Sequence, residues 1–253
     1  MQEWRVTTWN LQGSHGLDRR FVGEHITRER PDVFVIQEIM RRQARSLADD
    51  LGMRHVWARK HTPIPGRSEG LAILTPHAIG SWQSAMLTEA LPWSWRRRIL
   101  LRAQITRGAD RLSVLNVHLS PHGAADTRAR EFARIDAELD GGRACPGIDL
   151  IVGDFNDDPS VAAAALDPSF GAHDIGADGP ATCWSPGDRT GRPPTFRVDG
   201  AIGVGQFVGV RASTPSTDLD RWAKVSDHLP VTVEARRDLS TVSTVSAVST
   251  VSG

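Results

Sequence analysis

Polar side chains that could act on a phosphoester recur in this sequence where apolar runs end or begin. They are Asn10, Glu38, His118, Asp154, Asn156, Asp227 and His228. Strand ends are where α/β folds place their active sites. A single asparagine or aspartate at such a place is best explained as a turn residue or a cap. The recurrence of the whole set instead predicts one shared site.

The oxygen ligands in this set indicate a divalent metal. Glu38 and Asp227 offer carboxylates and Asn10 offers an amide oxygen, a donor set that suits Mg²⁺, with Mn²⁺ as the alternative. Zinc fits less well, because the two cysteines are scattered and the histidines lack the His-x-x-x-His spacing of zinc sites. The sequence therefore predicts a magnesium site.

Two histidines could manage the protons that phosphodiester hydrolysis requires. The reaction must neutralise charge on the phosphoryl oxygens, activate a water and stabilise the leaving oxygen. A carboxylate beside a histidine orients the ring and raises its pKa. We predict such pairs for His228 with Asp199 and for His118 with Glu69.

The hydrophobic pattern predicts the strands and helices that must position these residues. Residues 32–37 form a near-continuous apolar run, as expected of a strand buried on both faces. A hairpin is expected from residues 99–105 and 112–118. Further strands are predicted over 4–10, 70–74, 148–153, 198–204, 206–212 and 229–235, and helices over 18–30, 41–51 and 125–139. Strands outnumber helices, which favours two sheets covered by helices in layers.

The composition is that of an ordinary globular protein. Hydrophobic residues make up 40% of the chain, and 30 basic residues balance 30 acidic ones, so no overall field attracts a polyanion. We expect one domain over residues 1–238 and a disordered Ser/Thr/Val tail over 239–253. The chain shows no signal sequence and no apolar stretch of membrane-spanning length. We therefore expect a cytoplasmic protein, or a secreted one if a signal was removed, without stable membrane insertion.

Short motifs along the chain resemble, in order, those of the endonuclease/exonuclease/phosphatase family. They are Thr8-Trp9-Asn10, Ile36-Gln37-Glu38, Glu69-Gly70-Leu71-Ala72-Ile73-Leu74, Asn116-Val117-His118-Leu119, Gly153-Asp154-Phe155-Asn156, Arg197-Val198-Asp199 and Ser226-Asp227-His228-Leu229-Pro230-Val231. The Gly-Asp-Phe-Asn and Ser-Asp-His-Leu-Pro-Val blocks are specific for the family. The Trp-Asn and Gln-Glu pairs are weak evidence individually and strong evidence when they occur in this order. The resemblance spans nearly the whole body of the chain.

The resemblance implies an α/β fold and a metal site. The expected fold is a four-layer α/β sandwich, in which two central and mainly antiparallel sheets are flanked by helices. The site would lie between the strand ends of the two sheets. Glu38, Asn10 and Asp227 would hold Mg²⁺.

The resemblance also implies a set of catalytic groups. These are Glu69, His118, Asp154, Asn156, Asp199 and His228. Asp154 and Asn156 would orient the attacking water and a phosphate oxygen. His228, backed by Asp199, would act on the nucleophile or the phosphate. His118, backed by Glu69, would serve the phosphate or the leaving group. Which histidine is the acid and which is the base stays open at this stage.

Two positions depart from the family pattern or leave it ambiguous. The family often carries an aromatic residue after the aspartate of the Arg-Val-Asp motif, whereas this chain has Gly200. The threonine that contacts phosphate in the family corresponds to either Thr182 or Thr195, because the Gly- and Pro-rich loop between them makes the alignment ambiguous.

A basic and aromatic segment at residues 92–98 favours a nucleic-acid substrate, with DNA preferred. Its tryptophans could stack on bases and its arginines could contact phosphates. The family resemblance implies that an arginine near Arg97 or Arg98 contacts substrate phosphate. The alternative interpretation is a solvated strand entrance whose tryptophans pack underneath.

The leading functional hypothesis is a Mg²⁺-dependent, deoxyribonuclease-like phosphodiesterase. An alternative keeps the same site but acts on an inositol lipid, a sphingolipid or another small phosphoester, because the chemistry of a phosphoester does not reveal what is attached to it. A binding module that has lost catalysis is a third class, and the intact carboxylates and histidines speak against it.

Overall fold

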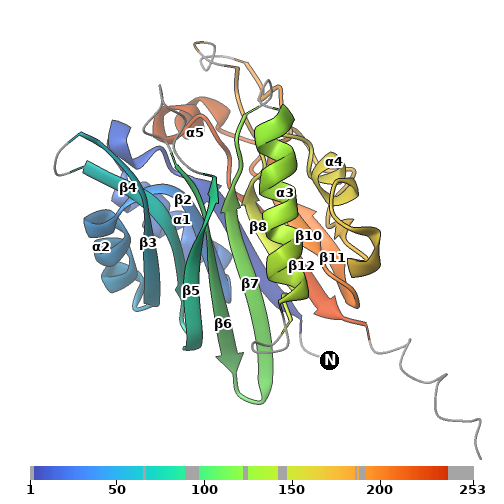
Figure 1. The fold of residues 1–253 in the computed structure, drawn as a ribbon. Coiled ribbons are helices and arrows are strands. Elements are labelled where there is room, and N and C mark those ends of the chain that lie inside the picture. The colour runs from blue at the N-terminus through green and yellow to red at the C-terminus, as the bar shows by residue number, and fades with distance from the viewer. Residues whose placement is uncertain are drawn as a thin grey trace, which may run out of the picture.

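Two stacked β-sheets form the centre of the molecule, and helices cover their outer faces (Figure 1). The computed structural model describes residues 3–64, 67–88, 97–121, 125–141, 147–185, 187 and 192–238. The predicted tail, Cys145 and residues 92–96 of the basic and aromatic segment lie outside these residues. The arrangement confirms the four-layer α/β sandwich expected from the sequence.

The first sheet holds six strands. Their spatial order is β11 (Phe207–Ser213), β12 (Val231–Arg237), β1 (Trp4–Asn10), β2 (Val33–Met40), β4 (Arg67–Thr75) and β3 (Arg54–Ile64). Strands β1 and β2 pair in parallel, and the other described neighbours pair antiparallel. The chain therefore leaves β1 and β2 at the same edge of the sheet.

The second sheet also holds six strands. Their order is β5 (Ala78–Thr88), β6 (Arg98–Arg107), β7 (Asp110–His118), β8 (Leu150–Asp154), β10 (Asp199–Gly203) and β9 (His173–Asp174). Strands β6 and β7 form the predicted hairpin, and β7 pairs in parallel with β8. The antiparallel pairs outnumber the parallel ones in the described part of both sheets, as the sequence led us to expect.

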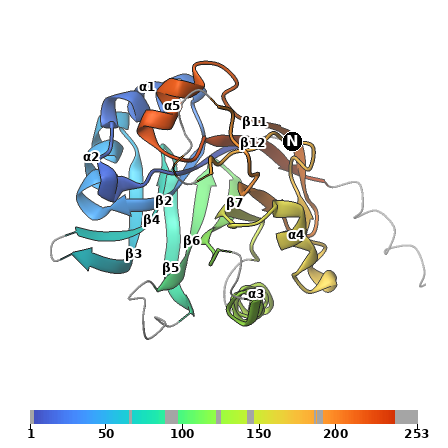
Figure 2. The same cartoon turned by 90° about the horizontal axis from the view of Figure 1, so that it is seen from above.

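Each outer face is covered by its own helices (Figure 2). Helices α1 (Arg19–Glu29), α2 (Arg41–Leu51) and α5 (Leu219–Val225) lie against the first sheet, and α3 (Ala125–Asp140) and α4 (Pro159–Ala164) lie against the second. Two short 3-10 helices span Gly13–His15 and Pro168–Phe170. No helix among the described residues is long and apolar enough to cross a membrane.

The pattern of the sequence did not indicate the edge strands β3 and β5. Nearly every residue of β5 is exposed or half-buried, and Trp82 is among the exposed ones. A strand at the edge of a sheet buries little apolar surface and needs no apolar run. The short helices α4 and α5 also went unpredicted, because too few of their residues repeat at helical spacing.

A buried polar network ties the two sheets together beneath their strand ends. The Asn116 side-chain amide on β7 donates to the carbonyl oxygens of Ile36 and Ala72, each at 3.0 Å, in the opposite sheet. Gln37 Nε2 donates to Asn116 Oδ1 at 2.9 Å. A buried amide that lost these partners would be costly, so the network holds the sheets in one relative position.

A histidine on α1 should make the stability of the fold sensitive to acid. His25 packs edge-on against Trp9 and Trp222 and is 6% exposed. Burial lowers the pKa of His25 from 6.5 to about 4, so the folded chain keeps the ring neutral while the unfolded chain protonates it. The stability that this ring contributes is complete above pH 6.5 and falls, by at most about 3 kcal/mol, as the pH drops toward 4.

Urea unfolding of the wild type and a His25→Leu variant near pH 7 and near pH 4.5 checks this expectation. The variant should lose less free energy of unfolding between the two pH values than the wild type does. Equal losses in the two proteins would contradict it.

Candidate active site

Neighbouring strands of the second sheet place three titratable side chains in a row. His118 ends β7, Asp154 ends β8 and Asp199 begins β10, and the strand register pairs His118 with Asp154 and Asp154 with Asp199. All three residues are buried. Adjacent strands lie about 5 Å apart, so this register alone brings their side chains to one edge of the sheet.

Gly153 is required for β8 to end in this way. Its φ is +150°, and a Cβ added to it would lie 2.0 Å from the Val117 carbonyl oxygen. Only glycine accommodates that conformation and that close approach of the backbone. The glycine of the Gly-Asp-Phe-Asn block therefore permits the packing that positions Asp154.

The first sheet contributes Asn10 at the end of β1. Its side-chain Nδ2 donates to Asp154 Oδ2 at 2.9 Å, a buried hydrogen bond across the two sheets. The backbone N–H of Asn156 donates to the other oxygen, Oδ1, at 2.9 Å. Asn156 has a φ of +49° and its side chain donates to the Leu119 carbonyl oxygen at 2.8 Å. Both oxygens of the Asp154 carboxylate are thus held in fixed directions.

Glu38 lies at a β-bulge in β2. The register between β2 and β4 shifts between Ile36 and Ile39, and Glu38 has a φ of +53°. A bulge of this kind re-aims a side chain at the edge of a sheet. The Glu38 carboxylate lies 3.8 Å from His118 Nδ1 and is 22% exposed, so it can be reached from solvent.

The Asp227-His228 pair precedes β12, on the other side of β1. Trp9 Nε1 on β1 donates to the His228 carbonyl oxygen at 2.9 Å, and the Ser226 hydroxyl donates to the Asn10 carbonyl oxygen at 2.6 Å. These bonds attach the segment to the end of β1. Asp227 accepts from Gln12 Nε2 at 2.7 Å, and its side chain is 19% exposed.

His228 and Asp199 form a buried pair across the two sheets. Their Nδ1 and Oδ2 atoms are 2.8 Å apart, and Asp199 Oδ2 also accepts from the Thr182 hydroxyl at 2.8 Å. Burial opposes the charge on both groups and raises the pKa of Asp199 to about 6. For His228 the penalty of burial is outweighed by the carboxylates of Asp199 and Asp154, which raise the pKa of the ring well above 6.5. The imidazolium–carboxylate form is therefore favoured.

The Nε2 atom of His228 faces the centre of the site. It lies 3.8 Å from an oxygen of Asp154 and 3.8 Å from an oxygen of Asp227. It is also 3.6 Å from the sulfur of Cys183, whose pKa burial raises. A protonated ring in this position can donate a hydrogen bond toward a bound oxyanion.

A buried lysine stands beside His118 and Glu38. Lys60 Nζ lies 3.3 Å from His118 Nδ1 and 3.6 Å from Glu38 Oε1, and its side chain is 2% exposed. Burial lowers the pKa of Lys60 to about 8, helped by the charge of Arg98 and opposed by carboxylates that include Glu69. This lysine places a positive charge next to the His118 ring and the Glu38 carboxylate.

The donor set of the site fits a metal ion. One ligand atom each from Asp154, Asp199 and His228 lie within 4.8 Å of one another. The second carboxylate oxygen of Asp199, Oδ1, is buried and has no hydrogen-bond partner among the described residues. Carboxylate oxygens of this kind are the ligands that hard divalent cations prefer.

A continuous chain of contacts joins the residues that the sequence analysis selected. Glu38 contacts His118, His118 Nε2 lies 3.6 Å from Asp154, and Asp154 contacts both Asn10 and His228. Glu69 is buried on β4, close enough for its charge to act on the lysine described above. Arg97 is exposed and Arg98 is buried, and both lie at the start of β6.

The structure also answers the two ambiguous positions. Thr182 is buried against Asp199, whereas Thr195 bonds to Ser185 at the surface, so Thr182 belongs to the site. A Cβ at Gly200 would lie 3.0 Å from the Pro159 ring, so a side chain here would require the start of α4 to move by a few tenths of an ångström.

Sequence reasoning missed three side chains of this site, which are Gln12, Lys60 and Cys183. Gln12 follows Asn10 closely in the chain and has a φ of +44°, a conformation that could not be deduced from the motif. Lys60 lies on β3, an edge strand that the pattern did not predict. Cys183 follows Thr182 directly in the chain. The sequence would have indicated this cysteine only if Thr182 had been chosen over Thr195.

Comparison with known proteins identifies relatives over nearly the whole chain. The model of the Endonuclease/Exonuclease/phosphatase family matches residues 7–228. No match was found among curated proteins. One similar solved structure is an endonuclease/exonuclease/phosphatase from Beutenbergia cavernae DSM 12333, with 20% identity and a TM-score of 0.71, covering 94% of this chain and 72% of that one.

Two further similar structures are described with different kinds of ligand or substrate. D. rerio TDP2 complexed with a single-strand DNA product is 16% identical, with a TM-score of 0.71 and coverage of 93% of this chain and 100% of that one. Bacteroides thetaiotaomicron VPI-5482 mannosyl-6-phosphatase Bt3783 is 17% identical, with a TM-score of 0.72 and coverage of 92% and 99%. At these identities the likeness shows a shared fold.

Proposed function

The chain belongs to the endonuclease/exonuclease/phosphatase family. From this membership and the geometry of the site, we propose that the protein is a metal-dependent phosphodiesterase that hydrolyses nucleic acid. DNA is the favoured substrate. Members of this family are metal-dependent hydrolytic phosphoesterases. The observation that carries the proposal is the Asp154 carboxylate, which is bonded to Asn10 and lies close to both His118 and His228.

Glu38, Asn10 and Asp227 are proposed to hold the cation, with Mg²⁺ favoured and Mn²⁺ as the alternative. Glu38 and Asp227 present partly exposed carboxylates, and Asn10 presents an amide oxygen, Oδ1, that accepts from the backbone N–H of Gln12 at 3.2 Å. When bound, the cation supplies positive charge that neutralises the phosphoryl oxygens. The buried carboxylate of Asp154 adds negative charge close to this position, since Asp154 and Asp227 each lie 3.8 Å from His228 Nε2.

The residues around the reacting phosphate have separable proposed roles. Asp154 orients the attacking water, because both of its oxygens are already fixed by hydrogen bonds and its carboxylate can accept from water. Asn156 serves the water or a phosphate oxygen. His228, protonated and held by Asp199, donates from Nε2 to a phosphoryl oxygen. His118, with Glu69 nearby, serves the phosphate or the leaving oxygen.

Two observations favour a nucleic acid over a small phosphoester. Arg98 lies near enough to the site for its charge to lower the pKa of Lys60, and Arg97 beside it is exposed to solvent. Adjacent arginines suit a ligand with several phosphates. The DNA product bound by D. rerio TDP2 shows that this fold can hold such a ligand. The mannosyl-6-phosphatase of the same fold keeps a phosphomonoesterase as the second candidate.

An assay panel distinguishes the two candidates and tests the metal. We expect nicking of supercoiled plasmid and cleavage of a single-stranded oligonucleotide in Mg²⁺, loss of both in EDTA and recovery when Mg²⁺ is returned. Phosphate release from mannose 6-phosphate, inositol phosphates and inositol lipids is measured in parallel. Faster turnover of any of these than of DNA would refute the nuclease assignment, and equal cleavage in EDTA would refute the metal requirement.

Arg97 provides a test of the substrate clue. An Arg97→Gln variant should bind DNA of any sequence more weakly. The slope of the logarithm of the binding constant against the logarithm of the salt concentration should decrease in magnitude by about one, because one phosphate contact is lost. Fluorescence anisotropy over a salt series, in EDTA to prevent cleavage, measures the slope. Arg130→Gln removes the same charge from the exposed face of α3 and should leave the slope unchanged. An unchanged slope in Arg97→Gln would remove this support.

A further inference from the structure

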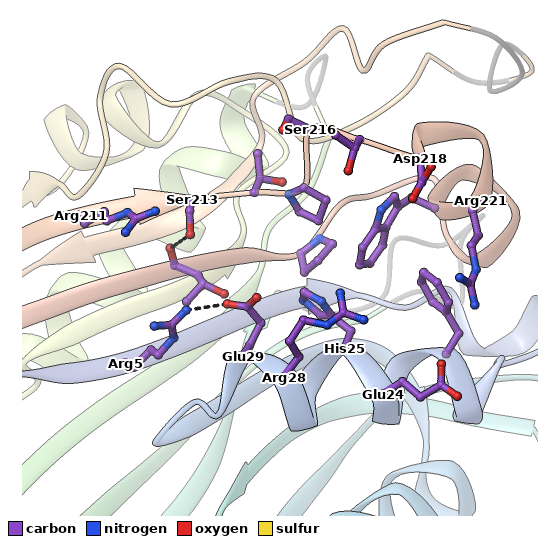
Figure 3. Close-up of a pocket in the computed structure, with 17 residues that line it drawn as sticks. Arg5, Glu24, His25, Arg28, Glu29, Arg211, Ser213, Ser216, Asp218 and Arg221 are labelled. Carbon is purple, nitrogen blue, oxygen red and sulfur yellow. Dashed lines mark hydrogen bonds and ion pairs between the residues drawn. The ribbon is translucent and has the colours of Figure 1, made fainter.

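A cavity lies on the outer side of the first sheet. Its volume is about 450 Å³, within the range of small-molecule sites. Helix α1 forms one wall, and the segment from the end of β11 to α5 forms the other (Figure 3). No residue of the proposed active site is among the described residues that line it.

The rim of this cavity carries arginines whose charge is not balanced nearby. Arg28 on α1, Arg211 on β11 and Arg221 on α5 all line it and are exposed. None of the three forms an ion pair with an acidic side chain in the described part of the chain. Arg221 lies over the ring of Phe21, 4.5 Å from its centre, which holds the guanidinium at the cavity edge.

The acidic side chains of the lining are mostly neutralised by other partners. Glu29 bonds to Arg5 at 2.6 Å, and Glu24 bonds to Arg20 at 2.9 Å. Asp218 is the remaining acidic group that lines the cavity among the described residues. Arg5 also bonds to Glu234 at 3.0 Å. The lining itself holds four arginines and three carboxylates, so it has an excess of one positive charge.

Buried polar groups at the cavity lack hydrogen-bond partners. Both ring nitrogens of His25 and the hydroxyl of Thr214 are buried without a partner among the described residues. Figure 3 shows His25 rising from α1 toward the opposite wall, beside Arg28. Native proteins satisfy almost all buried polar groups with protein, water or ligand partners, so these atoms leave polar capacity next to the cavity.

We propose that this cavity is a binding site for a small molecule that carries a phosphate or a similar oxyanion. Arg28 lies between Arg211 and Arg221 in the view of Figure 3, and each guanidinium can bind oxyanion oxygens. The hydroxyls of Ser216 and Thr217, on the opposite wall, supply further donors. His25 also lines the cavity, and burial keeps its ring neutral at pH 7, so it adds no charge to the site.

The site adjoins the active site through one indole. Trp9 packs against His25 and Trp222, with ring centres 5.9 Å and 5.5 Å away, and donates its N–H to the His228 carbonyl oxygen. A ligand in the cavity would thus lie behind the segment that carries His228. The two sites are nevertheless separate, and each has its own histidine to report on it.

Titration of the ¹⁵N-histidine-labelled protein with inorganic phosphate near pH 7 tests the proposal. Imidazole resonances of His25 report the cavity and those of His228 report the active site, with His25→Leu used for assignment. We expect the His25 resonances to shift in a saturable manner. An Arg28→Gln/Arg211→Gln variant should weaken that response about tenfold or more, because charge-assisted hydrogen bonds are lost. Arg130→Gln should leave it unchanged.

Two results would overturn the proposal. In the first, the His25 resonances stay fixed while those of His228 shift, which means that phosphate binds in the active site only. In the second, the His25 response survives in the Arg28→Gln/Arg211→Gln variant with its affinity unchanged. Both arginines are exposed, and thermal unfolding of the variant verifies that it remains folded. The readout does not depend on hydrolysis, so it stands or falls separately from the proposed function.

Discussion

An Asp154→Ala variant should hydrolyse its substrate about 10²–10⁴-fold more slowly than the wild type. This carboxylate accepts from Asn10 Nδ2 and from the Asn156 backbone, and it lies 3.6 Å from His118 Nε2 and 3.8 Å from His228 Nε2. Its removal leaves no carboxylate at this point to orient the attacking water. The effect should appear mainly in kcat, because the lost interaction is made in the transition state.

The same substitution should also cost some stability. Asn10 Nδ2 would lose its buried acceptor, at a cost of about 1–3 kcal/mol. Asp149→Asn is the matched control, because Asp149 precedes β8 at the opposite end of the strand and accepts from the Ser113 backbone at 2.8 Å. Steady-state kinetics and urea unfolding are measured on all three proteins. Near-normal turnover in folded Asp154→Ala would refute the role proposed for this residue.

The pair of His228 and Asp199 should behave as one catalytic unit. His228→Ala should lower kcat by about 10²–10⁴-fold, because the Nε2 donor is lost. Asp199→Asn should also lower kcat, because the neutral amide no longer raises the pKa of the ring or fixes its orientation. The double variant should be no slower than His228→Ala alone, since groups that act together are not additive.

A second histidine–aspartate pair in the chain provides the control for this experiment. His77 Nε2 lies 2.7 Å from Asp32 Oδ1, outside the contacts of the site. His77→Ala should cost stability and leave kcat close to that of the wild type. Additive losses in the His228→Ala/Asp199→Asn double variant would show that the two residues act independently, contrary to the proposed roles.

Much of the fold could be read from the sequence because local patterns encode it. The apolar run of β2, the hairpin of β6 and β7 and the helix α2 were all expected near their observed bounds. The edge strands β3 and β5 could not be predicted, since pairing with one neighbour stabilises them, whereas the edge strand β11 was expected over residues 206–212.

The residue types and order also determined the chemistry of the site. Strand-end carboxylates, amides and histidines, together with the Gly-Asp-Phe-Asn block, predicted a metal-dependent phosphoesterase of this family without any coordinates. The sequence therefore determined the class of enzyme and the identity of most candidate residues.

Only the tertiary structure decided how these residues are combined. The contact of Asn10 with Asp154 crosses two sheets, and so does the pair of His228 with Asp199. The position of Lys60 between Glu38 and His118 depends on an edge strand, and the choice of Thr182 over Thr195 depends on the path of an irregular loop. Such contacts are made between residues far apart in the chain, and sheet register and sheet packing, which no local pattern encodes, determine which of them meet.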